Sequence, residues 1–319
     1  MLGNQKYFHS KPHFSTMQRR HFVASSFVLG TSAALGLGGC ASRQVAHPKA
    51  DRAFHKALAL IEAQSGGRLG VFVFDAESGG STGYCADERF PMCSTFKTLL
   101  AARVLHMAQE GTVDLGLHAT IAAADVVAYS PVTEKRVGVP DGMTLLELCE
   151  AAVVVSDNTA ANVLLQATGG PTALTAWLRQ IGDQTTRLDR NEPTLNSAVA
   201  GDERDTTTPR AMNTTWQALL QGDTLKGFGR ALLQQWLVDS RTGDKRVRAG
   251  LPSDWKAGGK TGSGDNSSAG DTLIAWPNAQ SEGLIISAYL TGGQRSFAEN
   301  DAHMAKVGAA IGQWWAALG

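Results

Sequence analysis

Two serine–lysine pairs in this 319-residue chain have the spacing S-x-x-K, which can place a hydroxyl nucleophile beside an amine base. Ser94 and Lys97 stand at the start of an apolar stretch that predicts a buried helix. Because positions i and i+3 share a helix face, their side chains could touch there. Ser253 and Lys256 form the second pair. About one such match is expected by chance in a chain of this length, so the spacing alone does not identify a catalytic serine.

Three further polar motifs follow Ser94 along the chain. They are S-D-N at 156–158, E-x-x-x-N with Glu192 and Asn196, and K-T-G at 260–262. Alone, the first would be read as a polar turn or helix N-cap, the second as a solvated loop acid, and the third as an edge-strand lysine. The glycine of K-T-G removes a side chain from a predicted strand, as if another segment approached the backbone closely there.

Hydrophobic periodicity indicates the elements that must position these motifs. It predicts a helix over 48–65, strands within 68–84 and 255–292, mainly helical structure over 94–238, and a final amphipathic helix over 297–318. We therefore expect an α/β domain made of 48–92 and 239–319, split by an all-α domain over 93–238. A small-molecule site is expected in the cleft between the two domains.

Charge and histidine content narrow the classes of function. The chain has 29 basic and 29 acidic residues, so net charge gives no reason to expect a nucleic-acid partner. After residue 40 the histidines are scattered, without the ligand spacing of a zinc hydrolase. We expect neither a metal nor a cofactor.

Residues 1–40 predict an export signal segment. An arginine pair at 19–20 precedes a weakly apolar run, a pattern typical of the bacterial twin-arginine route. The run ends in L-G-G-C at Cys40, which resembles a lipoprotein cleavage box; ordinary cleavage near Ala41 is the alternative. We expect a periplasmic protein that contacts the membrane only through a lipid anchor on Cys40, if one is added.

The start of translation and the state of the cysteines stay open. Either Met1 or Met17 could be the first residue, because Met17 lies just before the arginine pair. Cys85, Cys93 and Cys149 follow the signal segment. An odd number implies at least one thiol that is free or paired between molecules. The alternative is that all three serve as small buried apolar side chains.

Taken together and in this order, the four motifs resemble those of the class A serine β-lactamases. The segments YSPVTEK from Tyr129, DGMTLLELC from Asp141, and EPTLN through GDERDTTTP strengthen the resemblance, which runs from about residue 48 to the end. It selects Ser94 over Ser253. It implies an α/β plus all-α fold, with an antiparallel sheet flanked by N- and C-terminal helices and a large helical insertion. It also implies a monomer that hydrolyses β-lactam antibiotics.

The resemblance implies roles for the polar residues. Ser94 would attack the lactam, with Lys97 or Glu192 through a water as proton acceptor. Ser156, beside Lys260, would relay a proton to the departing nitrogen. Glu192 would later activate the hydrolytic water, held with the help of the asparagine of E-x-x-x-N.

Further residues would bind substrate or support the site. Asn158 would bond the acylamide of the substrate, Tyr129 would wall the cleft, and Asn196 would help to hold the water. Arg190 and Asp205 match an ion pair that pins the loop carrying the general base.

A cation near the K-T-G strand is needed for the substrate carboxylate. Many family members carry an arginine on the next strand, where this chain has Ala269. Arg246 matches a position that supplies the replacement elsewhere in the family; a surface arginine is the alternative. Thr261 and Ser263 complete the substrate-binding set, and the backbone N–H groups of Ser94 and Ser263 would form the oxyanion hole.

Two departures from the family bear on specificity. The positions that pair with Cys149 and Cys93 in some members are Ala101 and Gly264, so neither bridge is expected. Loss of the second makes carbapenem hydrolysis less expected. The run KTGSGD, with Asp265, resembles that of cefotaximases and favours oxyimino-cephalosporins.

Two rival functions share part of the pattern. A D-alanyl-D-alanine peptidase or other penicillin-binding protein shares the S-x-x-K, S-D-N and K-T-G motifs but has no need of a deacylating acid such as Glu192. A non-catalytic β-lactam sensor would require a signalling segment, for which we find no room after the signal peptide.

Overall fold

A five-stranded antiparallel sheet joins the two ends of the described chain. The computed structural model describes residues 47–318, and its sheet has the order β2-β1-β9-β8-β7. The strands are β1 (Arg68–Asp75), β2 (Ser81–Tyr84), β7 (Lys256–Gly264), β8 (Ser268–Trp276) and β9 (Leu284–Thr291). Strand β1 pairs with β9 along its whole length, from Arg68 opposite Thr291 to Asp75 opposite Leu284. The early and late strands predicted from the sequence therefore build one sheet.

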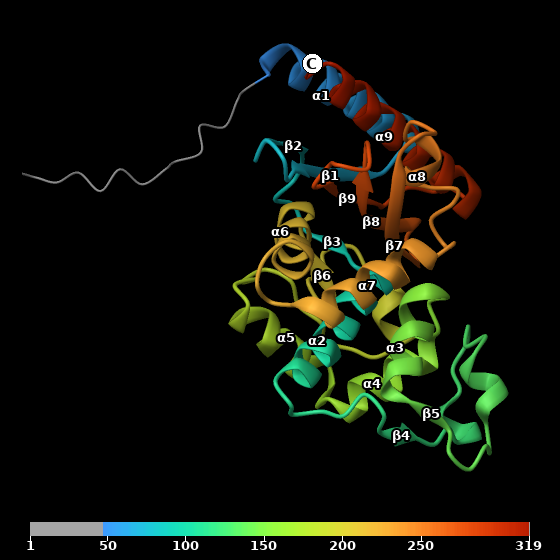
Figure 1. Cartoon of the computed structure of the whole chain (residues 1–319). Helices are drawn as coiled ribbons and strands as arrows, with labels where there is room; N and C mark the ends of the chain where they lie inside the picture. The colour runs from blue at the N-terminus through green and yellow to red at the C-terminus, as the bar shows by residue number, and fades with distance from the viewer. Residues whose placement is uncertain (1–46, 319) are drawn as a thin grey trace, which may run out of the picture. The chain divides into compact units, whose positions relative to one another are not determined.

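Two long helices pack together on one face of this sheet (Figure 1). Helix α1 (Pro48–Ser65) ends at Gly66 in the left-handed region, and α9 (Phe297–Ala316) begins with a capping box of Ser296 and Glu299. Both predicted terminal helices are confirmed. Alternate residues of β9, such as Ile286 and Leu290, face this helix layer, which reflects the period of two along a strand.

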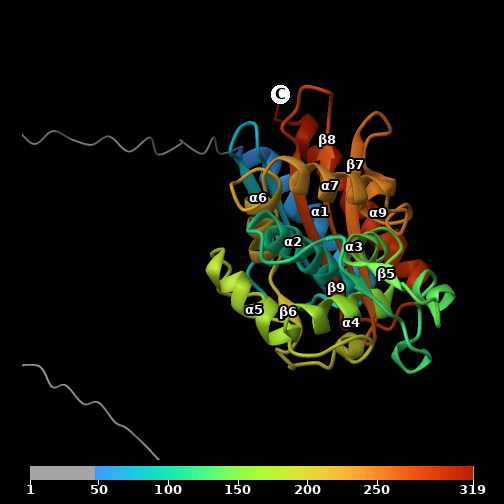
Figure 2. The same ribbon diagram turned by 60° about the horizontal axis from the view of Figure 1, so that its bottom comes forward.

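The other face of the sheet covers a second hydrophobic core made largely of helices. These are α2 (Phe96–Gln109), α3 (Leu145–Val154), α4 (Asn158–Ala167), α5 (Gly170–Gln180), α6 (Pro209–Leu220) and α7 (Gly227–Asp239). Figure 2 shows α2 among its helical neighbours α3, α4, α5 and α7. Nine of the residues of α2 are buried around its circumference, as expected of a central helix. The predicted helical region is thus confirmed.

Short elements depart from the sequence-based expectation. Strand β3 (Phe90–Pro91) pairs with β6 (Thr206–Thr207), and β4 (His118–Ala119) pairs with β5 (Met143–Thr144). A one-turn helix, α8 (Val247–Gly250), precedes β7. Segments of two to four residues are too short to show a hydrophobic period, so pattern analysis could not find them.

The described residues belong to one compact unit. The domain boundaries expected from the sequence stay a prediction. The export segment over 1–40, its arginine pair, Cys40 and the choice between Met1 and Met17 all lie outside the described residues. Within 47–318, no helix combines the length and the apolar composition required to cross a bilayer.

Candidate active site

Ser94 lies in a tight turn directly before α2. The turn is a 3-10 segment over Cys93–Thr95, and Cys93 has a positive φ of 44°. Thr95 Oγ1 donates to Met92 O at 2.8 Å and also contacts the buried hydroxyl of Tyr289 on β9 at 3.1 Å. The turn that presents Ser94 is therefore fixed to the sheet behind it.

Glu192 reaches both members of the S-x-x-K pair. Ser94 Oγ donates to Glu192 Oε1 at 3.1 Å, and Lys97 Nζ lies 3.0 Å from the same oxygen. The side chains of Lys97 and Glu192 have no solvent exposure. Desolvation of two buried charges is costly, so the pair marks a position where charge is needed rather than a simple source of stability.

Ser156 stands between two buried amines. It lies between α3 and α4 with a φ of 61°, and its Oγ accepts from Lys260 Nζ at 2.9 Å and from Lys97 Nζ at 3.3 Å. Lys97 Nζ also donates to Ser156 O at 2.8 Å. Because its oxygen receives both ammonium donors, the hydroxyl hydrogen of Ser156 is left to be given to another group.

The two lysines have unusual proton affinities for one shared reason. Burial lowers the pKa of Lys97, although the neighbouring Glu192 carboxylate opposes that change. Burial also lowers the pKa of Lys260, well below its ordinary value, and the nearby charge of Lys97 adds to the effect. Both amines are therefore easier to deprotonate than an exposed lysine, as proton-transfer groups require.

Asn196 completes the surroundings of the Glu192 carboxylate. Its Nδ2 donates to Glu192 Oε2 at 2.5 Å, while its Oδ1 is buried and has no hydrogen-bond partner among the described residues. A buried acceptor without a partner commonly binds a water. Asn196 Oδ1 is therefore an acceptor available to a water in the neighbourhood of Glu192.

Asn162 was missed by the sequence analysis. From α4, its Nδ2 donates to Glu192 O and its Oδ1 accepts from Glu192 N, both at 2.9 Å. These two hydrogen bonds fix the backbone of Glu192 to α4, where Asn162 lies 30 residues earlier in the chain. An asparagine four positions after Asn158 is the only local signal, and nothing in the sequence pattern links it to Glu192.

The loop that carries Glu192 is anchored by a buried carboxylate. Arg190 Nε donates to Asp205 Oδ2 at 2.5 Å, and Asp205 Oδ1 accepts from the backbone N–H groups of Asp189 and Arg190. Arg190 Nη1 also donates to Ser197 Oγ at 2.9 Å. The expected pairing of Arg190 with Asp205 is confirmed.

Strand β7 approaches the nucleophile at Gly262. A Cβ atom there would lie 2.6 Å from Met92 O and 2.9 Å from Ser94 N, so no larger residue fits. The close approach predicted from the K-T-G glycine is confirmed. It places the backbone N–H of Ser94 against the strand that continues into Ser263, as an oxyanion hole made of both N–H groups requires.

Arg246 lies beside Ser263 and is only 5% exposed, so the surface-arginine alternative is wrong. Its Nη2 donates to Ser263 Oγ at 2.6 Å, its Nη1 to the carbonyl groups of Gly262 and Gly270, and its Nε to Asp301 Oδ1 at 2.7 Å. Ala269, where many family members have arginine, is the β-sheet partner of Ser263. The guanidinium thus supplies positive charge behind Ser263 instead of projecting freely.

The other substrate-binding candidates border the same group. Asn158 Oδ1 accepts from Lys97 Nζ, and Asn158 Nδ2 donates to Ala128 O at 2.8 Å. Tyr129 is 63% exposed, and Tyr129 O accepts from Asn158 N at 3.0 Å. Thr261 is buried on β7 next to Lys260.

Asp157 turns the S-D-N motif into a structural anchor. Its carboxylate accepts from the backbone N–H groups of Val132, Thr133 and Ala160 and from the Thr133 hydroxyl, at 2.8–3.0 Å. It caps α4 and holds the segment that follows Tyr129. The N-cap interpretation of this motif therefore applies to its aspartate, while Ser156 and Asn158 turn to the lysines.

The remaining candidates lie elsewhere. Ser253 and Lys256 are both exposed, which removes them from this buried group. Cys93 and Cys149 are buried and Cys85 is half-buried, and none of these three is in a disulfide. Burial raises the pKa of Cys85 to about 11 and that of Cys93 to about 12, so both favour the unreactive thiol. Within 47–318, no three His, Cys, Asp or Glu side chains are grouped to hold a metal ion.

Comparison with known proteins agrees with this arrangement. The model of the β-lactamase enzyme family matches residues 53–315. The chain is 44% identical to β-lactamase AST-1 of Nocardia asteroides, over 92% of this chain and 95% of that protein. It is 47% identical to β-lactamase CTX-M-8 of Citrobacter amalonaticus, over 73% and 79%. The solved structure of an ancestral Gram-negative class A β-lactamase is similar at a TM-score of 0.79 and 53% identity, over 81% of this chain and 98% of that one.

Proposed function

Because the chain belongs to the class A β-lactamases and is an enzyme that opens β-lactams, we propose that it does so through an ester on Ser94. The Ser94 oxygen bonds to the lactam carbonyl carbon, the carbon–nitrogen bond breaks, and the nitrogen takes a proton. Water then hydrolyses the ester and restores the serine. The product released is an acid in which the lactam ring is open. Opening the ring of the antibiotic gives resistance to it.

One observation carries this proposal: a single buried carboxylate meets both the nucleophile and the place where a water would bind. Glu192 Oε1 accepts from Ser94 Oγ, and Glu192 Oε2 accepts from Asn196. The direct bond from Ser94 makes Glu192 one candidate for the first proton acceptor, and Lys97, which lies 3.0 Å from the same oxygen, is the other and remains when Glu192 is replaced. Lys97, held at 3.0 Å, stabilises the carboxylate charge.

Proton delivery to the leaving nitrogen falls to Ser156. Its oxygen accepts hydrogen bonds from Lys260 and Lys97. When Ser156 gives its proton to the ring nitrogen, an amine whose pKa is lowered can therefore replace that proton. The rate contribution of such a positioned group is typically about 10²–10⁴.

The substrate carboxylate is assigned to the β7 side of the site. Ser263 accepts a hydrogen bond from Arg246, which leaves the Ser263 hydroxyl hydrogen to donate to a carboxylate. Thr261 lies two residues earlier on the same strand. A serine at 263 followed by Asp265 supports a preference for oxyimino-cephalosporins within this activity.

The enzyme is proposed to act as a monomer in the periplasm. Its export rests on the arginine pair and apolar run within residues 1–40. Acylation of Cys40 would add a lipid anchor to the exported form.

Replacing Glu192 by glutamine tests the mechanism. Glutamine keeps the size and hydrogen-bonding reach but cannot accept the proton from water, so the second step should slow by about 10²–10⁴. Intact-mass spectrometry after mixing with a penicillin should show one added penicillin on Ser94, and Ser94→Ala should remove it. Glu77→Gln, an exposed acid on the β1–β2 turn, is the control and should turn over as the parent does.

The same experiment separates the rival functions. A long-lived adduct in the unmutated protein would indicate a penicillin-binding protein or a sensor. Rapid turnover by the Glu192→Gln variant without an adduct would remove Glu192 from the mechanism.

A further inference from the structure

Tyr289 lies behind the turn that carries the nucleophile, in a row of the sheet that is otherwise glycine. Across β7, β8, β9 and β1 the paired residues are Gly262, Gly270, Tyr289 and Gly70. A Cβ atom on Gly270 would lie 2.8 Å from the Tyr289 ring. One on Gly70 would overlap the ring of Phe90, which stacks on Tyr289 with 6.2 Å between centroids. The small residues therefore make room for these two rings against the sheet.

The Tyr289 hydroxyl belongs to a chain of hydroxyl groups with a fixed direction. Thr95 Oγ1 gives its one hydrogen to Met92 O at 2.8 Å, so it must be the acceptor in its 3.1 Å contact with Tyr289. Tyr289 therefore donates to Thr95 and is left to accept from Thr272 Oγ1 at 3.2 Å. Burial raises the pKa of Tyr289, so the hydroxyl keeps the hydrogen that this chain needs. The chain thus runs from β8 through β9 into the turn before α2.

The acceptor at the end of this chain, Met92 O, closes the turn that presents Ser94. It accepts from both the backbone N–H and the hydroxyl of Thr95. Met92 N donates to Asp205 O at 2.9 Å, and the Asp205 carboxylate anchors the loop that carries the general base. Inside the turn, Cys93 has a φ of 44°, a conformation that persists only where the surroundings hold it. The hydrogen bonds from the sheet are therefore part of what keeps this turn in place.

We propose that the hydroxyl of Tyr289 is a positioning group for acylation, and that it acts through Thr95 to fix how Ser94 presents its N–H and its Oγ. This inference rests on the proposed ester at Ser94. Tyr289 is 1% exposed and lies behind the turn, so it acts without touching the substrate. A small shift of the turn would misplace both the attacking oxygen and one of the two oxyanion donors. Loss of the hydroxyl should therefore slow formation of the ester and leave substrate binding unchanged.

Single-turnover kinetics of Tyr289→Phe test this inference. Phenylalanine keeps the ring and its stacking on Phe90 but lacks the hydroxyl. Combined with Glu192→Gln, which should trap the ester, the variant is mixed with a penicillin at several concentrations and adduct formation is followed by intact-mass spectrometry. The limiting rate should fall about 10- to 100-fold relative to Glu192→Gln alone, the scale for a misplaced reacting group. The penicillin concentration that gives half of that rate should not change.

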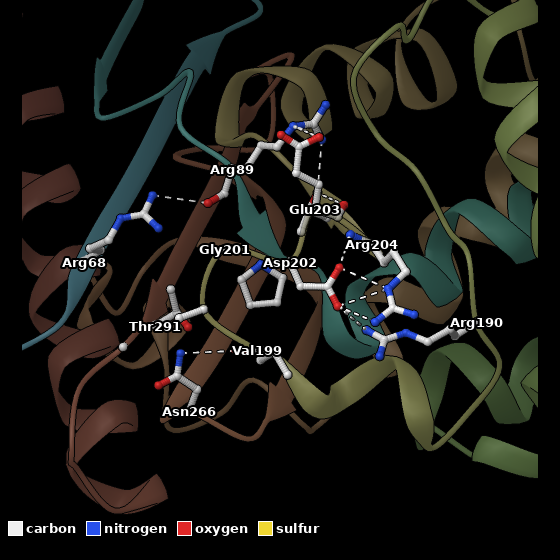
Figure 3. Close-up of a pocket in the computed structure, with 15 residues that line it drawn as sticks. Arg68, Arg89, Arg190, Val199, Gly201, Asp202, Glu203, Arg204, Asn266 and Thr291 are labelled. Atoms are coloured by element: carbon white, nitrogen blue, oxygen red, sulfur yellow. Dashed lines mark hydrogen bonds and ion pairs between the residues drawn. The ribbon is translucent and has the colours of Figure 1, made fainter.

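Thr291→Val is the matched control. Thr291 Oγ1 and Ser268 Oγ form another buried hydroxyl pair between β8 and β9, at 2.7 Å. Thr291 lines the cavity of about 300 Å³ drawn in Figure 3, whose wall includes neither Ser94 nor Thr95. Each variant loses one buried hydroxyl, so both should unfold about 2–4 °C below the parent. Only Tyr289→Phe should slow ester formation, and equal slowing by Thr291→Val would overturn the inference.

A double-mutant cycle tests the route through Thr95. Thr95→Val already removes the group on which Tyr289 acts, so adding Tyr289→Phe should slow ester formation no more than about twofold further. Effects that multiply would overturn this route. If Glu192→Gln alone forms no adduct on Ser94, the ester mechanism fails and this inference fails with it. Adducts that form equally fast with and without the Tyr289 hydroxyl would overturn this inference alone.

Discussion

Arg246 shows how one side chain can act through its neighbour. Its guanidinium is almost fully occupied by two carbonyl groups, Asp301 and Ser263, so little of it remains to meet a substrate directly. Its charge instead orients the Ser263 hydroxyl and raises the positive potential at the strand. A charged hydrogen bond of this type is worth about 1.5–3 kcal/mol.

Arg246→Ala should lower kcat/KM for carboxylate-bearing β-lactams by a factor of roughly 30, mainly through KM, which corresponds to about 2 kcal/mol. Ser263→Ala should cause most of the same fall in kcat/KM. It should also reduce turnover of an oxyimino-cephalosporin more than that of a simple penicillin. Steady-state kinetics on both substrates would measure this. Arg241→Ala, at an 80% exposed side chain, is the control. If both variants keep parental KM, the carboxylate is bound elsewhere.

Strand β8 supports this arginine with a buried acid. Asp271 is 2% exposed and accepts from Val247 N at 3.1 Å. Burial raises its pKa from 3.8 to about 6, although the charges of Arg246 and Arg248 oppose the rise. Because the folded pKa exceeds the unfolded one, the stability linked to this group is complete below pH 3.8 and is lost as the pH rises through 6.

Asp271→Asn should therefore flatten the dependence of stability on pH. From pH 5 to 7.5 the parent protein should lose on the order of 1 kcal/mol that the variant does not lose, because the folded pKa of Asp271 is raised to about 6. Urea unfolding at the two pH values would measure the difference. An unchanged gap between parent and variant would mean that Asp271 stays ionised across this range.

The elements also show what a sequence can predict here. Ser94, Ser156 and Lys260 could be predicted because each belongs to a short motif, and the motifs taken together resemble those of a known family. Asn162 and Asp301 could not, because their roles depend on contacts with Glu192 and Arg246 at positions 30 and 55 residues away. The helices at both ends were predictable from periodicity and caps. The paired strands β3 and β6 were not, since two residues carry no period.

At the scale of the whole molecule, the part that carries the chemistry is distinct from the segment that is proposed to direct it. The described residues 47–318 contain both hydrophobic cores and every residue assigned to the site. Folding and activity should therefore be independent of the arginine pair at 19–20, which should decide only where the protein is delivered.

Replacing Arg19 and Arg20 by lysine should remove at least nine-tenths of the lactamase activity from the periplasmic fraction while total activity in lysed cells is retained. Fractionation followed by a hydrolysis assay would measure both. Alanine at Lys6 and Lys11, which leaves the arginine pair intact, should have no effect. Activity that stays periplasmic in the double-lysine variant would exclude the twin-arginine route, and palmitate labelling that survives Cys40→Ala would exclude the lipid anchor.

The pairing of β1 with β9 has a consequence for how the protein is made. Roughly 200 residues separate the two strands, and a ribosome adds about 5–20 residues each second, so β1 waits about 10–40 s for its partner. During that time the Val- and Phe-rich β1 has only the short β2 as a strand partner, with α1 available to cover one face. Strands β8 and β9 are likewise needed before β7 can hold Gly262 against Ser94. We therefore expect the nascent enzyme to be inactive until β9 has been made, with β1 the strand whose edge stays unpaired longest.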